Sequence, residues 1–447
     1  MTDPSDWVEG FGGMGTGPCP RRLHHPDDTG GGGVYRLNEG AVRDDTLSNG
    51  TRVVTEKVPG VRSAAVGVWV RQGSAYEPPA TLGISHMLEH MVFKGSHRRS
   101  AHELANALES LGGSLDAYTT REHTSFQARV LDEHLPQAFD VLADLILNPA
   151  LRVEDLESEK KVVQEELSAV DDTPDDLVFE LHGERFWQGH PYGHSILGTH
   201  DSVAGLTEHA LRSLHGEKYR GSNMLIAAAG NVDHSHVMEL AESLFSGTPA
   251  VSEASSSLEE PPTAPVGEER VDRPTSQTHI VIGTRTPSRS DPRRYTFGLV
   301  SAAFGGGMSS RLFQKVREEL ALAYSVFSYQ SFYRTSGITG VYVGTRPQAA
   351  DEAVAVILQE YGRLAEGSLG EEEFEQTRNQ VKGQMTLGLE SSSARLYRLA
   401  GFALYDEPFL TLDELLARID AVTAESVAEV AREFFSPERQ FSLRLGP

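Results

Sequence analysis

Two histidines and a glutamate lie close together in the segment GISHMLEHMVFKGS, residues 83–96. In a helix, positions i and i+4 share one face, so His86 and His90 can direct two imidazole nitrogens at one point. Zn²⁺ accepts such nitrogens at about 2.0–2.1 Å. Glu89 lies beside the pair, where it can polarise a metal-bound water. The order H-x-x-E-H therefore predicts a zinc site with its catalytic base, and chance placement of three polar residues is the alternative.

A third protein ligand is expected on the charged segment EDLESEKKVVQEELSAV, residues 154–170. Glu159, Val162 and Glu166 fall on one stripe of a helix over this segment. Glu166 can complete a site of two histidines and one glutamate with an open position for water, and Glu159 can hydrogen-bond a ligand histidine. Spacing alone leaves Glu165 open as the ligand. A solvated helix with pairs such as Glu157–Lys161 is the structural alternative.

These residues resemble the pitrilysin–insulinase family, the inverzincin metallopeptidases, and the likeness covers nearly the whole chain from about residue 45. The closest likeness is to the short two-domain branch, which includes bacterial processing-peptidase-like proteins and the β-subunit of mitochondrial processing peptidase. The family places its third ligand about 75 residues after the motif, and 75 residues separate His90 from Glu166. It also has a supporting glutamate seven residues before that ligand. The resemblance therefore implies Glu166, rather than Glu165, as the ligand and Glu159 as its supporting residue.

The second half of the chain carries an independent match. The segment VREELALAYSVFS, residues 316–328, resembles the family's Arg-x₆-Tyr element, here Arg317 and Tyr324. The resemblance implies that this pair acts on the substrate near the scissile carbonyl. An exposed helix arginine and a core tyrosine are the ordinary alternatives.

The segment GGSLDAYTTREHTSF, residues 112–126, resembles the strand that lies beside the active site in the family. The family usually has Asn at the position of Asp116 in this chain. The family's asparagine helps to hold the substrate backbone. An ionised aspartate accepts a hydrogen bond and cannot donate one, so we expect Asp116 to affect substrate preference or activity. His190, His194 and His200 resemble a loop of the family and are expected to be structural.

The surrounding sequence alternates between strand and helix patterns. Val53–Val70 reads as two strands joined through Pro59 and Gly60, which predicts a hairpin. Leu115–Leu131 alternates and predicts a strand. Ser100, with Glu103 three residues later, predicts the capped start of a helix. Further helices are predicted over residues 84–94, 135–149, 153–173 and 235–247, and a buried strand over 223–232.

The same order recurs after a segment rich in Ser, Pro and Glu. Strands are predicted over residues 276–287, 324–345 (two) and 440–447, and helices over 293–321 (broken at Gly305–Gly307), 349–367 and 371–391. This predicts an α+β fold of two similar domains, each a mostly antiparallel sheet packed with helices. The expected organisation is a flexible leader (1–40), an N-terminal zinc-binding catalytic domain (41–248), a linker (249–275) and a C-terminal homologous domain with the Arg/Tyr element (276–447).

Composition limits the function classes. The chain has 447 residues, 39% hydrophobic and 23% charged, which is typical of a soluble globular protein. Its net charge of −24 argues against nucleic-acid binding. Cys19 is the one cysteine, so any metal must be held by His, Asp or Glu, and a cytoplasmic location is expected. The absence of a long apolar run predicts no transmembrane helix or membrane partner, and the N-terminus does not read as a signal peptide.

The sequence and the resemblance together predict a zinc-dependent endopeptidase with one Zn²⁺ per chain. It would cleave unfolded peptides inside a clam-shell chamber. Because longer relatives have four such domains and this chain has two, the resemblance implies a homodimer, or a heterodimer with a homologue. The alternative is a catalytically silent or partner-dependent subunit of a processing-peptidase-like assembly.

Overall fold

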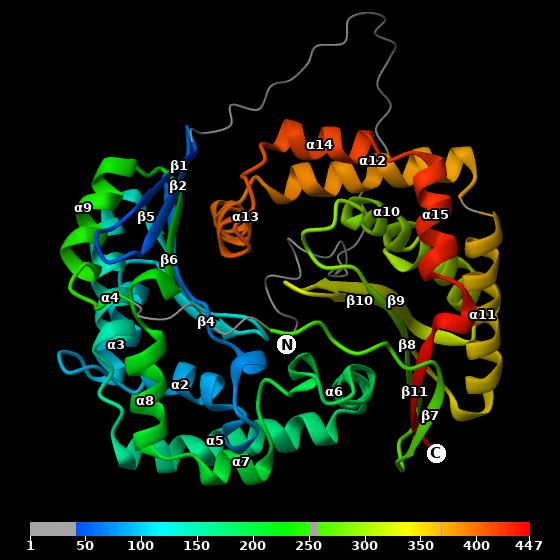
Figure 1. The fold of residues 1–447 in the computed structure, drawn as a ribbon, viewed down its shortest axis with the longest axis horizontal. Coiled ribbons are helices and arrows are strands. Elements are labelled where there is room, and N and C mark those ends of the chain that lie inside the picture. Colours follow the sequence, from blue (N-terminus) through cyan, green and yellow to red (C-terminus); the bar gives the residue numbers. More distant parts are fainter. Residues whose placement is uncertain (1–41, 251–257, 368) are drawn as a thin grey trace, which may run out of the picture.

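A computed structural model of the chain describes residues 42–250, 258–367 and 369–447. The described residues form two halves, and each half contains one β-sheet with helices packed on it (Figure 1). The predicted leader, with Cys19, lies outside the described residues. The α+β fold with two similar sheets is confirmed. Each sheet packs its helices over a separate hydrophobic core.

The first sheet has, within the described residues, the order β1-β2-β6-β3-β5-β4 and is antiparallel except between β2 and β6. Its helices include α3 (Ala101–Glu109), α4 (Leu135–Leu147), α8 (Glu208–Lys218) and α9 (His234–Phe245). Ser100 caps α3 in a capping box with Glu103, as predicted. The strands are β1 (Val42–Thr46), β2 (Arg52–Lys57), β3 (Ser63–Val70), β4 (Ser114–Thr119), β5 (Thr124–Leu131) and β6 (Met224–Gly230).

Two strand predictions in this half are wrong, one in the pairing of its strands and one in their number. β2 and β3 are not a hairpin, because β6 lies between them and pairs with both. Leu115–Leu131 is not one strand but the hairpin β4–β5. The hydroxyl of Thr120 accepts hydrogen bonds from the backbone N–H groups of Glu122 and His123, which stabilises the turn.

The second sheet has, within the described residues, the order β7-β11-β8-β10-β9 and is antiparallel except between β7 and β11. Strand for strand, this repeats the order β2-β6-β3-β5-β4 of the first sheet, including the parallel pair. The recurrence predicted from the sequence is therefore a recurrence of topology. β7 falls inside the predicted linker, so the second sheet starts earlier than residue 276. The strands are β7 (Gly267–Asp272), β8 (Thr278–Thr286), β9 (Ala323–Phe332), β10 (Gly337–Thr345) and β11 (Phe441–Gly446).

The helices of the second half begin with α10 (Arg294–Gly305), which ends at the predicted glycine break. A π-helix, η6 (Phe313–Glu319), follows that break. The remaining helices are α11 (Ala350–Gly367), α12 (Glu371–Gly388), α13 (Ser392–Leu404), α14 (Leu412–Asp420) and α15 (Ala424–Phe434). The last three were not among the predicted elements.

Each half contributes one helix that packs on the sheet of the other half. α6 (Pro174–Trp187) precedes β6 in the chain but packs on β8 and β11 of the second sheet. α13 precedes β11 but packs on β2, β3 and β6 of the first sheet (Figure 1). One apolar cluster joins Val178 to Val281, and another joins Trp69 to Leu396. The predicted domain limits therefore group each of these two helices with the half on whose sheet it does not pack, and they leave β7 in the linker.

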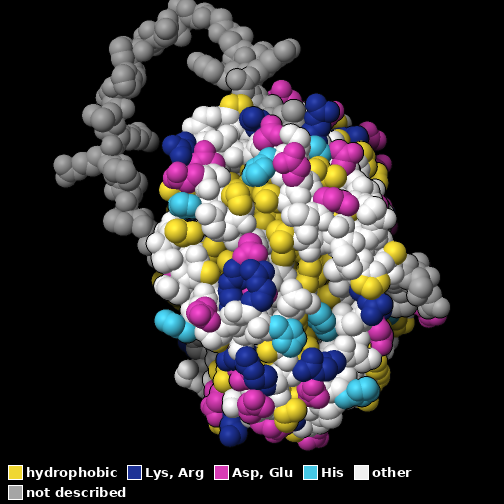
Figure 2. All heavy atoms as spheres, turned by 90° about the vertical axis from the view of Figure 1, so that its left-hand side faces the viewer, with side chains coloured by type: hydrophobic (Ala, Val, Ile, Leu, Met, Phe, Trp, Pro, Cys, Tyr) yellow, Lys and Arg dark blue, Asp and Glu magenta, His cyan; other side chains and the backbone are white. Residues whose placement is uncertain are grey.

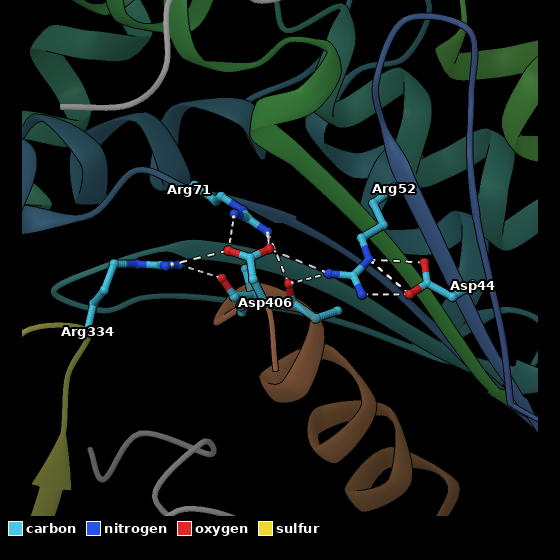
Figure 3. Close-up of polar contacts among 7 residues, drawn as sticks. Asp44, Arg52, Arg71, Arg334 and Asp406 are labelled. Carbon is cyan, nitrogen blue, oxygen red and sulfur yellow. Dashed lines mark hydrogen bonds and ion pairs between the residues drawn. The ribbon is translucent and has the colours of Figure 1, made fainter. Parts of the chain in front are cut away.

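Charged side chains on and just beyond α13 join this helix to the first sheet. Glu56 of β2 is fully buried and pairs with Arg395 and Arg398 of α13. Beyond the end of α13, Asp406 lies between Arg52, Arg71 and Arg334 at 3.6, 3.2 and 3.5 Å (Figure 3). Arg334 comes from the turn between β9 and β10, so the two sheets are linked through this cluster.

On the face shown in Figure 2, acidic and basic side chains are interspersed around a band of hydrophobic side chains. The net negative charge is therefore not gathered into one uniform patch on this face. Among the described residues, no helix combines the length and the apolar character that crossing a membrane requires.

Candidate metal centre

Two helices hold the three predicted ligands. α2 (Ile84–Val92) buries Leu88, Met91 and Val92 in the first core, which leaves its histidines on the opposite side. α5 (Val153–Asp172) packs against α2. His86 Nε2 lies 3.2 Å from His90 Nε2, and these two atoms lie 3.8 and 3.7 Å from Glu166 Oε2. Among the described residues, these three form the one His/Cys/Asp/Glu group with metal-binding spacing.

The donor set fits a zinc ion. Tetrahedral coordination with bonds of about 2.0–2.1 Å separates ligand atoms by about 3.3 Å, close to the observed spacing. His90 Nδ1 lies 3.1 Å from Glu159 Oε1, so we assign its ring proton to Nδ1, which leaves the Nε2 lone pair free. Burial, and then the charge of His90, lower the pKa of His86 to about 3, so its ring is neutral near pH 7. Two nitrogen lone pairs and a carboxylate therefore converge, which is unfavourable without a cation.

Glu159 is buried, with 3% of its surface exposed, and its second oxygen pairs with Lys94. The lysine balances the carboxylate charge while the first oxygen orients His90. Lys94 was not predicted from the sequence as a residue of the metal centre. It lies beyond the end of α2, and its spacing carries no signal that it turns toward α5.

The predicted stripe on α5 is wrong in one residue. Val162 is 43% exposed, whereas its neighbour Val163 is fully buried in the first core. Val163 stands four residues after Glu159, so it shares the inward face more closely than Val162 does. Glu165 is exposed and does not join the ligand group, whereas Glu166 does.

The predicted base, Glu89, is half-buried on α2 and accepts a hydrogen bond of 2.6 Å from the hydroxyl of Thr119. Thr119 ends β4, an edge strand of the first sheet. Burial, and then the negative charge of Glu89, raise the pKa of the Tyr219 hydroxyl, so a neutral phenol lies near the base. Thr119 and Tyr219 were missed because both lie on other elements than the motif.

The other predicted residues lie apart from the ligand group. Asp116 is exposed on β4. Arg317, on η6, places its guanidinium 4.5 Å from the ring centre of Tyr324, the second residue of β9, which is 75% exposed. In the described part of the chain, neither Arg317 nor Tyr324 forms a hydrogen bond or ion pair with His86, His90 or Glu166. β9 is the edge strand of its sheet and corresponds to β4 in the repeated topology.

His190, His194 and His200 each contact a polar group of another segment of the chain. His190 lies 3.0 Å from the carbonyl oxygen of Glu259, and His194 lies 3.3 Å from that of Ser74. His200 contacts Gln164 of α5. These contacts agree with the structural role expected for them.

A cavity of ≈720 Å³ lies between the α5–α6 junction and the second sheet. Its walls include acidic, aromatic and imidazole groups, among them Asp171, Asp175, Phe179, His279, Phe327 and Tyr342. Asp171 follows Glu166 by five residues on α5, and Ser325, which also lines the cavity, follows Tyr324. The lining of the cavity therefore includes residues close in sequence to Glu166 and to Tyr324.

The chain resembles known proteins along most of its length. Residues 52–200 match the insulinase family, peptidase family M16, and residues 205–381 match the peptidase M16 inactive domain. An uncharacterized zinc protease of Streptomyces coelicolor is 37% identical over 421 residues, 91% of this chain and 90% of that protein. One of Bacillus subtilis is 36% identical over 400 residues, covering 89% and 97%.

Solved structures share the fold. A protease from Helicobacter pylori superposes with a TM-score of 0.86 at 21% identity, over 91% of this chain and all of that one. A peptidase M16 inactive domain from Pseudomonas fluorescens gives 0.85 at 19% identity, over 91% of this chain and 98% of that one. The sequence relatives place the chain in the class of zinc proteases. Within that class, it belongs to the insulinase family, peptidase family M16.

Proposed function

We propose that this chain is a zinc-dependent endopeptidase that binds one Zn²⁺ through His86, His90 and Glu166. The observation that carries the proposal is the convergence of these three donor atoms beside Glu89. A zinc ion there supplies Lewis acidity, which polarises a peptide carbonyl and makes water a stronger acid.

The remaining steps fall to the chain's own residues. Glu89 takes the proton of the attacking water and later passes it to the leaving amine. Thr119 keeps one oxygen of that carboxylate in place, which orients the base. Tyr324 and Arg317 supply donors for the developing oxyanion. Asp116, exposed at the free edge of β4, receives the substrate backbone as an added strand.

The proposed substrates are unfolded peptides, cleaved in a chamber between the two halves. An extended chain can pair with an edge strand, whereas a folded protein has already paired its own backbone. The ≈720 Å³ cavity, with acidic and aromatic walls, is within the usual size range of a ligand pocket and suits peptide side chains.

We further propose that the working form is a homodimer, or a heterodimer with a homologue, in which Tyr324 and Arg317 serve the metal centre of the other chain. The pair is presented outward, since Tyr324 is 75% exposed, and it makes no polar contact with this chain's own ligand group among the described residues. The dimer would complete the site from two copies.

Metal analysis and cleavage of an internally quenched peptide test the proposal on wild type and Glu89→Gln. We expect one zinc per chain in both proteins and a fall in kcat of about 10²–10⁴-fold in the variant, the usual contribution of a general base. Unchanged cleavage by Glu89→Gln would contradict the mechanism. A zinc-loaded wild type that cleaves no peptide would favour the silent or partner-dependent subunit.

A further inference from the structure

The start of the helix that carries the histidines is held by a carboxylate from another segment. Glu77 Oε2 accepts the backbone N–H of Gly83 at 2.6 Å, and Glu77 Oε1 accepts that of Ser85 at 2.8 Å. The first N–H groups of a helix have no partner within the helix. Gly83, at the N-cap of α2, has no side chain to supply one. Glu77 therefore acts as the cap. Burial raises the pKa of its carboxyl to about 7, whereas the hydrogen bonds from Ser85 and Gly83 favour the ionised form, which suits the positive end of the helix.

The reason for this distant cap lies in a backbone crossing. Gly83 and Gly198 both have positive φ, at 85° and 79°. A Cβ atom on Gly83 would lie 2.4 Å from the carbonyl oxygen of Leu197, and one on Gly198 would lie 2.4 Å from that of Leu82. The crossing thus excludes Ser, Thr, Asn or Asp from the N-cap position, the residues that normally cap a helix from within.

The same crossing reaches the second ligand helix. The hydroxyl of Ser202 donates to the carbonyl oxygen of Leu82 at 2.8 Å, just before α2. The carbonyl oxygen of His200 accepts the amide of Gln164 at 2.8 Å, two residues before Glu166 on α5. One short segment, Leu197–Ser202, therefore bonds to the start of α2 and to the ligand-bearing turn of α5.

We propose that Glu77 is a positioning residue of the metal centre and that Leu197–Ser202 completes a brace around it. Glu77 fixes the first turn of α2, which begins two residues before His86. The segment Leu197–Ser202 fixes that turn relative to α5. Together they set where the two Nε2 atoms stand against the carboxylate of Glu166. Because a metal centre loses affinity when its donor atoms shift, the brace contributes to zinc binding without touching zinc. This inference rests on the proposed zinc site.

The test is zinc affinity, measured by competition with a chromophoric chelator, together with the visible absorption of the Co²⁺-loaded protein. In Glu77→Gln the side-chain amide cannot accept both backbone N–H groups. We expect zinc binding 10- to 100-fold weaker, as is usual when a supporting residue is lost, and an altered Co²⁺ spectrum. The matched control is Glu103→Gln, which removes the carboxylate at the start of α3, a helix without predicted ligands. It should bind zinc like wild type.

A folded Glu77→Gln with wild-type zinc affinity and Co²⁺ spectrum would overturn the inference while leaving the zinc site itself standing. Wild type that binds no zinc would instead overturn the proposed function and, with it, this inference. If Glu77→Gln does not fold, Ser202→Ala decides, because it removes the hydrogen bond to Leu82 together with the capping bond that the Ser202 hydroxyl accepts from the N–H of Thr199. Zinc binding several-fold weaker is expected in Ser202→Ala, and unchanged affinity there overturns the brace.

Discussion

Thr119 donates a hydrogen bond of 2.6 Å to Glu89, so the last residue of an edge strand holds the candidate base on the metal-binding helix. The same strand exposes Asp116 three residues earlier. A peptide that pairs with β4 would therefore lie on a strand that is already hydrogen-bonded to Glu89, the group that transfers the proton of the attacking water. This joins substrate alignment and base orientation in one element.

The first prediction concerns this contact. Thr119→Val removes the hydroxyl at nearly constant volume, so Glu89 loses one fixed orientation. We expect kcat for a quenched peptide to fall about 10-fold, the equivalent of one hydrogen bond to a charged group, with zinc content unchanged. Thr119→Ser keeps the hydroxyl and should restore most of the rate. If the valine and serine variants had equal kcat, the hydroxyl would have no orienting role.

The second prediction separates two neighbouring glutamates. Glu166→Gln should weaken zinc binding by more than about 100-fold, because it removes a direct ligand rather than a supporting residue. Glu165→Gln is the matched control one position away, exposed and outside the ligand group, and should bind zinc normally. Metal content after dialysis against a weak chelator distinguishes them. Zinc loss in Glu165→Gln alone would reverse the assignment.

The third prediction tests the support of His90. Glu159→Gln should weaken zinc binding by about 10–100-fold, since a neutral amide oxygen stabilises the ring proton on Nδ1 less strongly than a carboxylate does. Glu157→Gln, on the exposed side of the same helix, provides the comparison, because its carboxylate pairs with Lys160 rather than with a histidine. Isothermal titration with zinc measures both. Equal affinities would leave Glu159 with no part in metal binding.

The fourth prediction concerns a shared site in a homodimer. Glu89→Gln and Tyr324→Phe chains are each expected to be inactive alone. In a mixed dimer with shared sites, one site combines an intact Glu89 with an intact Tyr324 from the other chain. Random mixing during co-expression should restore about a quarter of wild-type activity, since half of the dimers are mixed and each has one complete site. No recovery in purified mixed dimers would place both residues in one chain's site.

The fifth prediction concerns acid. His182, on helix α6, is 1% exposed, stacks on Phe186 and packs at a tilt against Phe441. Burial lowers its pKa from 6.5 to about 4. The unfolded chain therefore takes up a proton between pH 6.5 and 4 that the folded chain does not, so stability falls as pH falls through this window. The contribution is about 2–3 kcal/mol between pH 7 and pH 4.5.

Urea unfolding at the two pH values measures this effect. His182→Phe cannot take up a proton and should lose correspondingly less stability on acidification than wild type. His236→Phe, at an exposed position of α9, should lose as much as wild type. Equal losses in wild type and His182→Phe would exclude His182 as a source of the acid sensitivity.

The site was predictable where its geometry is local. His86 and His90 share one helix, whose 3.6 residues per turn set their relation. Glu166 lies on another helix, so the residue pattern left Glu165 equally open until the family spacing was used. Glu77 and Thr119 carry no such signal. Their contacts depend on the crossing at Gly83 and on the turn after β4, and neither is set by a period along the chain.

The fold follows the same rule. Helices such as α4 and α9 were predicted because their apolar residues repeat with the helical period. The β2–β3 hairpin was wrong because β6, far along the chain, takes the place between the two strands. No local pattern shows that α6 packs on the second sheet and α13 on the first. These pairings are set by which apolar faces meet in three dimensions.

The exchange of α6 and α13 also governs how the molecule comes apart. Each sheet is covered by a helix that belongs, along the chain, to the other half, so neither half closes its core alone. Heating should accordingly show a single cooperative transition instead of one for each sheet. A chain severed between residues 250 and 258 should remain one particle. The packing of α6 and α13 on the opposite sheets, rather than the covalent connection between the halves, would then hold the two halves together.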